Sequence, residues 1–174
     1  DITTSALPMQ VKQLFRRTVD TGIKHGTVTV MMGDTGYEVT TYRIDGNYAD
    51  GRHPDSVEFS ANLRDDLKRR DFTINAMAYN NSDGLVDEFN GIGDLQAGIV
   101  RCVGDARERF TEDALRMMRA IRFSAQLGFI IDEDTYSAIG AMADTISKVS
   151  MERIHDELGK ILMSDHPDYV KRLC

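Results

Sequence analysis

The first sixty residues alternate between helical and strand patterns of apolar and polar positions. Residues 8–17 begin with a proline and place apolar side chains at helical intervals, so we predict a short helix there. The segments TVTVMM and YEVTTYRI are rich in β-branched and aromatic residues and flank residues 33–36, which predicts a β-hairpin. Residues 45–56 are polar and contain glycine and proline, so we expect a mobile loop.

After this loop the pattern changes from mixed to helical. We expect two helical stretches, a strand near Leu85–Asp87, a helical piece ending near Ala97 and a strand near Ile99–Val103. From Asp105 almost to the end the spacing is helical, and one helix has a buried stripe made of Ala114, Met117, Met118, Ile121 and Ala125. We therefore predict an α+β chain, with an α/β part over residues 1–104 and a helical part over residues 105–174.

Two polar segments, RRDFTINAMAYN at residues 69–80 and TEDALRMMRAIRF at residues 111–123, combine basic, acidic and amide side chains. Residues three or four positions apart share a helix face, so Asp71 should lie beside Asn75. By the same spacing Asp113 should lie beside Arg116, the first of a row of arginines: Arg116, Arg119 and Arg122. Arginines next to a carboxylate suit a polyanion with a hydrogen-bonding base, so we predict a nucleoside triphosphate site.

A simpler interpretation of the second segment is structural. Glu112 and Arg116 are four residues apart and would form a surface ion pair of a few tenths of a kcal/mol. Thr111 would then be the N-cap of the helix, and the acidic residues after it would suit the helix dipole. For this segment alone the structural interpretation is favoured, whereas both segments in one chain favour the nucleotide site.

Composition narrows the class of protein further. With 41% hydrophobic and 28% charged residues, the chain is typical of globular proteins. It has no apolar run near the roughly 20 residues of a membrane span, and Cys102 and Cys174 form neither a disulfide framework nor a metal motif. We therefore expect a cytoplasmic protein with no membrane partner. The net charge of -7 argues against a chain that binds nucleic acid over its whole surface, so any RNA contact would be local.

The two polar segments, together with GLVDEFNGIGDLQAGIVRCVGDARERF and the opening DITTSALPMQVKQLF, resemble the bacterial class II tRNA nucleotidyltransferases, or CCA-adding enzymes, and their poly(A) polymerase relatives. The resemblance runs from residue 1 to about residue 163. It implies a nucleotidyltransferase head with a small mixed β-sheet and flanking helices, followed by an all-helical neck. Family members begin with a glycine-rich GGxVRD segment and a D-x-D strand, of which Asp1 matches the second aspartate. We therefore expect residues 1–174 alone to be nearly inactive.

The resemblance also implies Mg²⁺ as cofactor. Nucleotidyl transfer places two divalent ions about 4 Å apart, and aspartates two positions apart on a strand point to one face. Asp1 is the member of that pair present here, and Glu38 matches the acidic position that the family has on a neighbouring strand. A solvent-facing strand residue is an equally good interpretation of Glu38. Asp1 and Glu38 are thus the candidate metal ligands and catalytic residues.

The remaining candidates concern the nucleotide. Cytosine and adenine both present an amine donor beside a ring-nitrogen acceptor, whereas uracil and guanine present a carbonyl and a ring N–H. A carboxylate beside a guanidinium therefore fits C and A, and Asp113 and Arg116 match the family's template positions. Arg119 and Arg122 would serve phosphates or orient the template, and Arg122 is equally suited to a structural ion pair. The family segment that contacts ribose and phosphate is matched by Arg70, Asp71 and Asn75.

We therefore expect an enzyme that adds C and A from CTP and ATP to the 3′ end of tRNA. The alternatives within the family are a poly(A) polymerase and relatives that add only CC or only A. The resemblance implies that CC-only members have a shorter loop in this region, so the complete-looking loop at residues 45–56 argues mildly against a CC-only enzyme. An alternative of another class is a non-catalytic nucleotide- or RNA-binding module with the same fold.

Overall fold

The computed structural model describes residues 1–46 and 56–173. These residues form two compact units, residues 1–46 with 56–69 and residues 70–173. Most of the loop predicted at residues 45–56 lies outside the described part. The change to helical structure predicted at residue 104 falls inside the second unit, and as a domain boundary it stays a prediction.

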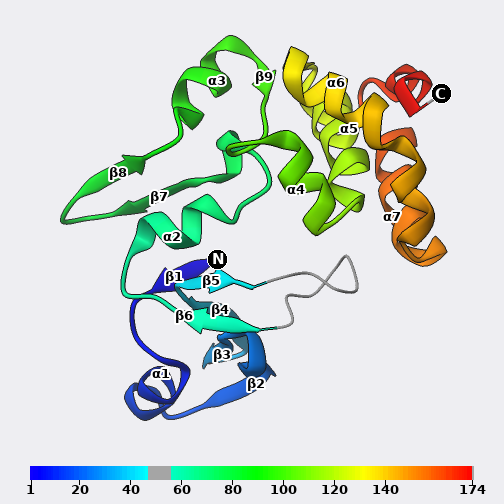
Figure 1. The fold of residues 1–174 in the computed structure, drawn as a ribbon. Helices are drawn as coiled ribbons and strands as arrows, with labels where there is room; N and C mark the ends of the chain where they lie inside the picture. The colour runs from blue at the N-terminus through cyan, green and yellow to red at the C-terminus, as the bar shows by residue number, and fades with distance from the viewer. Residues whose placement is uncertain (47–55, 174) are drawn as a thin grey trace. The chain divides into compact units, whose positions relative to one another are not determined.

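The first unit is built on a small mixed sheet (Figure 1). Its four strands lie in the order β1-β4-β3-β2, with β1 parallel to β4 and the other pairs antiparallel. The 3₁₀ turn η1 follows β2, a separate two-stranded ribbon joins β5 to β6, and α2 ends the unit. The bounds are β1 Ile2–Thr4, α1 Pro8–Leu14, β2 Thr18–Gly22, η1 Ile23–His25, β3 Thr27–Met32, β4 Thr35–Thr41, β5 Arg43–Asp45, β6 Val57–Phe59 and α2 Leu63–Lys68.

The predicted hairpin of the first unit is confirmed, and the helix predicted over residues 8–17 forms but ends at Leu14, where the backbone of Phe15 becomes extended. Helix α1 has Pro8 at its first position, and its buried Val11 packs against Val30 of β3 and Val39 of β4. The hairpin turn is tighter than predicted, because Met32 pairs directly with Thr35 and leaves only two residues between the strands. Gly33 in this turn has a φ of 63°, in the left-handed region that favours glycine.

The second unit begins with short elements and continues as helices (Figure 1). A large core joins α4 to α7, with Phe72, Phe110, Ile121 and Ile161 among its fully buried side chains. No helix in the described residues is long and apolar enough to cross a membrane. The bounds are η2 Thr73–Asn75, β7 Met77–Asn80, β8 Gly84–Asp87, α3 Gly91–Ala97, β9 Ile99–Val100, α4 Ala106–Glu112, α5 Leu115–Leu127, β10 Ile130–Ile131, α6 Glu133–Met142, η3 Ala143–Lys148, α7 Met151–Leu162 and η4 Pro167–Leu173.

The segment at residues 69–80 is not the helix that its spacing predicted. Only Thr73–Asn75 form a 3₁₀ turn, and Met77–Asn80 form a strand that pairs antiparallel with Gly84–Asp87. Pairing with a neighbouring strand therefore overrides the local helical pattern. Strand β8 ends at Asp87. The carboxylate of Asp87 accepts the backbone N–H of Gly91 and Ile92 at 2.7 and 2.9 Å and so caps α3.

The helical part agrees more closely with the sequence. Every residue of the predicted stripe on α5, from Ala114 to Ala125, is buried. The strand near Leu85 and the helix ending at Ala97 are also confirmed, whereas the strand predicted near Ile99–Val103 is shorter and ends at Val100. The short strand β10, which pairs parallel with β9, was not predicted.

Candidate functional site

Asp71 is the centre of a hydrogen-bonded cluster in the second unit. Its Oδ1 accepts the backbone N–H of Phe72 at 2.9 Å and the side-chain amide of Asn75 at 3.2 Å. Its Oδ2 accepts two guanidinium N–H groups of Arg119, with Nε at 2.8 Å. The predicted proximity of Asp71 and Asn75 is thus observed, although a tight turn rather than a helix creates it. Asp71 is only 7% exposed, so its carboxylate is fixed in place.

Arg119 and Arg122 both lie against the ring of Phe123. Their Cζ atoms are 5.6 and 4.1 Å from the ring centroid, within the range of a cation–π interaction. Arg122 also donates from Nε to Glu157 of α7 at 2.6 Å, and the Glu157 carboxylate is buried. These contacts favour the structural interpretation of Arg122. The Arg119 side chain keeps 34% of its surface exposed.

The segment at residues 111–123 forms two helices rather than one. Helix α4 ends at Glu112, and the backbone of Asp113 is extended, with φ of -149° and ψ of 106°. The expectation that Thr111 is an N-cap is wrong, because Thr111 lies inside α4 and its hydroxyl donates to the carbonyl of Arg107. The N-cap of α4 is Asp105, whose carboxylate accepts two backbone N–H groups of the first turn.

Asp113 lies at this joint, and Arg116 lies in the first turn of α5. Asp113 Oδ1 accepts the backbone N–H of Leu115 at 3.0 Å, so its side chain caps the first turn of α5. The same carboxylate accepts two N–H groups from Arg153 of α7, at 2.7 and 3.3 Å. Arg116 pairs with Glu112, as the structural interpretation expected, and Glu112 also pairs with Arg109. The carboxylate and the guanidinium proposed to read the base are therefore each held by a partner of opposite charge.

Asp1 and Glu38 belong to the first unit and are arranged differently. Strand β1 pairs with β4 so that Ile2 is opposite Val39, and Asp1 and Glu38 are the residues that directly precede this pair in the two chain segments. Neighbouring residues at matching positions point to the same face of a sheet. Both residues are exposed. Among residues 1–46 and 56–173, no group of three or more His, Cys, Asp or Glu side chains is placed to hold a metal ion.

Of the sequence candidates, Asp1 and Glu38 lie in the first unit and the others lie in the second. Arg70, the first residue of the second unit, is partly buried. The sequence interpretation missed Arg153 and Glu157, which hold Asp113 and Arg122. Both lie on α7, tens of residues from their partners, so no local spacing could reveal them.

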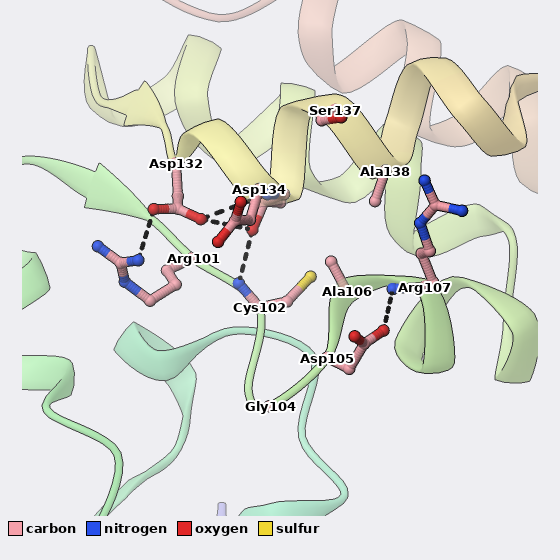
Figure 2. Close-up of a pocket in the computed structure, with 11 residues that line it drawn as sticks. Arg101, Cys102, Gly104, Asp105, Ala106, Arg107, Asp132, Asp134, Ser137 and Ala138 are labelled. Carbon is pink, nitrogen blue, oxygen red and sulfur yellow. Dashed lines mark hydrogen bonds and ion pairs between the residues drawn. The ribbon is translucent and has the colours of Figure 1, made fainter.

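A separate cavity of about 440 Å³ lies between residues 101–107 and the start of α6 (Figure 2). In this cavity Arg101 pairs with Asp132, and the hydroxyl of Thr135 accepts the backbone N–H of Cys102. Burial raises the pKa of the Cys102 thiol to about 12, so it is unsuited to act as a nucleophile. None of the metal- or nucleotide-binding residues that the sequence predicted lines this cavity.

The chain thus combines a mixed sheet that has exposed carboxylates with helices that carry paired arginines and carboxylates. Two family models match the chain: "Poly A polymerase head domain" over residues 1–101 and "Probable RNA and SrmB- binding site of polymerase A" over residues 128–174. The chain belongs to the Poly A polymerase head domain family.

Curated relatives and solved structures agree with this assignment. The chain is 54% identical over 163 residues to a CCA-adding enzyme of Leuconostoc mesenteroides and 54% identical over 167 residues to one of Lactiplantibacillus plantarum. The matches include 94% and 96% of this chain, respectively. The chain spans only 41% of the length of each relative. The fold is similar to that of the Bacillus stearothermophilus CCA-adding enzyme in complex with CTP, with a TM-score of 0.88 and 43% identity over 98% of this chain and 41% of the other. The fold is also similar to that of a Thermotoga maritima CCA-adding enzyme complexed with tRNA_CCA. The TM-score is 0.73 and the identity is 28%, over 95% of this chain and 38% of the other.

Proposed function

We propose that this chain is the nucleotide-selecting and catalytic part of an enzyme that adds C and A from CTP and ATP to the 3′ end of tRNA. The observation that carries the proposal is the joint between α4 and α5, where a carboxylate and a guanidinium three residues apart are each held by ion pairs. The relatives support it, since those named above are CCA-adding enzymes and one matching structure was solved with CTP.

In this proposal Asp113 and Arg116 select the base. The Asp113 carboxylate accepts a hydrogen bond from the exocyclic amine of cytosine or adenine, and Arg116 donates to the adjacent ring nitrogen. Uracil and guanine present a carbonyl to the carboxylate and an N–H to the guanidinium, so both contacts become repulsive. One protein pair thereby accepts two bases and rejects two.

The Asp71 cluster positions the rest of the nucleotide. Both Asp71 oxygens are occupied by protein donors, so this residue acts by orienting Arg119 and Asn75. The exposed part of Arg119 is then directed at a phosphate, and Arg70 supplies further positive charge nearby in sequence. We assign Arg122 to holding α5 against α7 through Glu157 rather than to the triphosphate.

Asp1 and Glu38 are the proposed ligands of Mg²⁺. Their positions directly before the paired residues Ile2 and Val39 give the oxygen ligands that Mg²⁺ prefers, and water and substrate phosphates would complete its coordination. A bound divalent ion would neutralise the triphosphate and lower the pKa of the attacking hydroxyl. The residues of this chain contribute the two carboxylates and the face of the sheet that orients them.

The test uses the intact protein, Mg²⁺ and tRNA that lacks its last three nucleotides, incubated with each labelled triphosphate in turn and with all four together. The proposal expects C from CTP alone, a complete CCA end from CTP and ATP, and little product from UTP or GTP. Long A tails would instead identify a poly(A) polymerase, the alternative that the family description favours. Addition limited to A or to CC would identify a partial activity, and nucleotide binding without any product would identify a binding module.

A further inference from the structure

Asp113 is held by a residue that is distant in sequence. Arg153, on α7, donates from Nη2 to Asp113 Oδ2 at 2.7 Å and from Nη1 to Oδ1 at 3.3 Å. The two side chains are 22% and 14% exposed, so water competes only weakly for this pair. The two parallel bonds fix the plane of the carboxylate as well as its position.

The hydrogen bonds of the Asp113 carboxylate are distributed unequally between its two oxygens. An ionised carboxylate has about four acceptor positions. In the described chain Oδ1 accepts from Leu115 and from Arg153, whereas Oδ2 accepts only from Arg153. The open acceptor position is therefore on Oδ2. A carboxylate held in this way offers one fixed acceptor to one amine donor.

We propose that Arg153 is a positioning and specificity-determining residue for base selection. It does not contact the base itself. By fixing the Asp113 carboxylate, it presents Oδ2 to the exocyclic amine of C or A and prevents a rotation in which the side chain accommodates the carbonyl of U or G. This inference rests on the proposed function, because it assigns a role to Arg153 through the base contact of Asp113.

Lysine cannot replace arginine in this role. A lysine ammonium keeps the charge but is a point donor on a flexible chain, whereas the planar guanidinium bonds to both carboxylate oxygens at once. Arg153→Lys therefore separates the geometry of the pair from its charge. Lys160 provides the matched control, since it is a basic residue on the same helix that pairs with Glu157 and is 52% exposed.

The experiment compares the intact wild-type protein with Arg153→Ala, Arg153→Lys, Asp113→Ala, the Asp113→Ala/Arg153→Ala double variant and Lys160→Ala. For each, kcat/KM is measured with CTP, ATP, UTP and GTP, and Tm is recorded. We expect Arg153→Ala to reduce the CTP-over-UTP and ATP-over-GTP ratios by about tenfold, the size of one misplaced charged hydrogen bond. Arg153→Lys should reduce them by an intermediate factor at unchanged Tm, and Lys160→Ala should leave them unchanged.

The double variant distinguishes positioning from general structural support. If Arg153 acts through Asp113, its removal in the Asp113→Ala background should change the ratios no further, since coupled residues are not additive. Additive losses, or wild-type ratios in both Arg153 variants, would overturn the inference while the effect of Asp113→Ala still supported the proposed function. A wild-type protein that transfers no nucleotide, or does not discriminate among the four, would overturn both.

Discussion

The carboxylates of Asp1, which precedes β1, and of Glu38 on β4 are held differently from those of the region α4 to α7. Asp1 and Glu38 are exposed, and the structure shows no ion pair for either within the described residues. In the helical region Asp113, Glu112 and Glu157 are each paired with an arginine that is itself largely covered. One region thus has negative charge available to an incoming cation, and the other has its charges already compensated.

This difference separates two requirements of the proposed reaction. A metal ion brings its own strong charge, so its ligands need only be close together and accessible to water. A base is neutral and is recognised by the direction of its donors and acceptors, so the groups that read it must be oriented before it arrives. We therefore expect substitutions on the sheet to reduce the rate and substitutions in the helices to reduce selectivity or stability.

The largest effect is expected from Glu38→Gln. The substitution removes a charge that we propose binds the metal ion and stabilises the transition state by several kcal/mol, so CTP incorporation should fall on the order of a thousandfold. Because Glu38 is exposed, Tm should stay within a degree or so of the wild type. Glu58→Gln, at an exposed position of β6, is the control and should retain activity. Wild-type incorporation by the Glu38 variant would remove this residue from the metal site.

The next largest effect is expected from Glu157→Ala. It removes the carboxylate that pairs with Arg122, in a setting where the Arg122 and Glu157 side chains are 12% and 5% exposed. Breaking such a pair costs about 3 kcal/mol, measured as the free energy of unfolding in a denaturant titration. Glu152→Ala, at an exposed position of the same helix, should have little effect. Equal losses of unfolding free energy in the Glu157 and Glu152 variants would show that the Arg122–Glu157 pair does not hold α5 against α7.

A smaller and more specific effect is expected from Arg116→Ala. Loss of one charged hydrogen bond to the base edge should lower kcat/KM for CTP and ATP by roughly ten- to a hundredfold. UTP and GTP, which are mismatched already, should lose less, so discrimination should narrow. Steady-state kinetics with all four triphosphates measures this ratio. An unchanged ratio in a folded variant would leave the Glu112–Arg116 pair with only its structural role.

The smallest effect concerns the acid stability of the α3 cap. Burial alone would raise the pKa of Asp87, but hydrogen bonds from Ile92, Gly91 and the neighbouring backbone N–H groups outweigh it, so the pKa lies below its usual value. A carboxyl group with a lowered pKa in the folded state stabilises the protein above its unfolded-state pKa, and that stability is lost as the pH falls through the folded-state value. Asp87→Asn should therefore lower Tm slightly at pH 7 and make no difference at strongly acidic pH. Thermal melts from pH 7 down to pH 2 test this, and a constant Tm difference would contradict it.

The sequence predicted those features whose causes are local. The proline at the start of α1, the β-branched and aromatic residues of β3 and β4 and the apolar stripe of α5 all depend on neighbours in the chain, and the elements they predicted are present. The prediction of a helix at residues 69–80 was wrong, because the backbone of Met77–Asn80 pairs with β8. The resemblance identified Asp113 and Arg116 as candidates. It could not identify Arg153 and Glu157, because only the packing of α7 on α5 places these two residues beside their partners.

The extended backbone at Asp113 has a consequence for how this segment can vary in evolution. Each residue of a continuous helix rotates the next by about 100°, so one added residue would redirect every side chain after it. Because helical geometry is interrupted at Asp113, α4 and α5 do not share a single rotational phase. Within α5, however, all residues share one phase, so we expect insertions and deletions among homologues to be rare between Leu115 and Phe123. A length change there would turn Arg116 and Arg119 away from their partners.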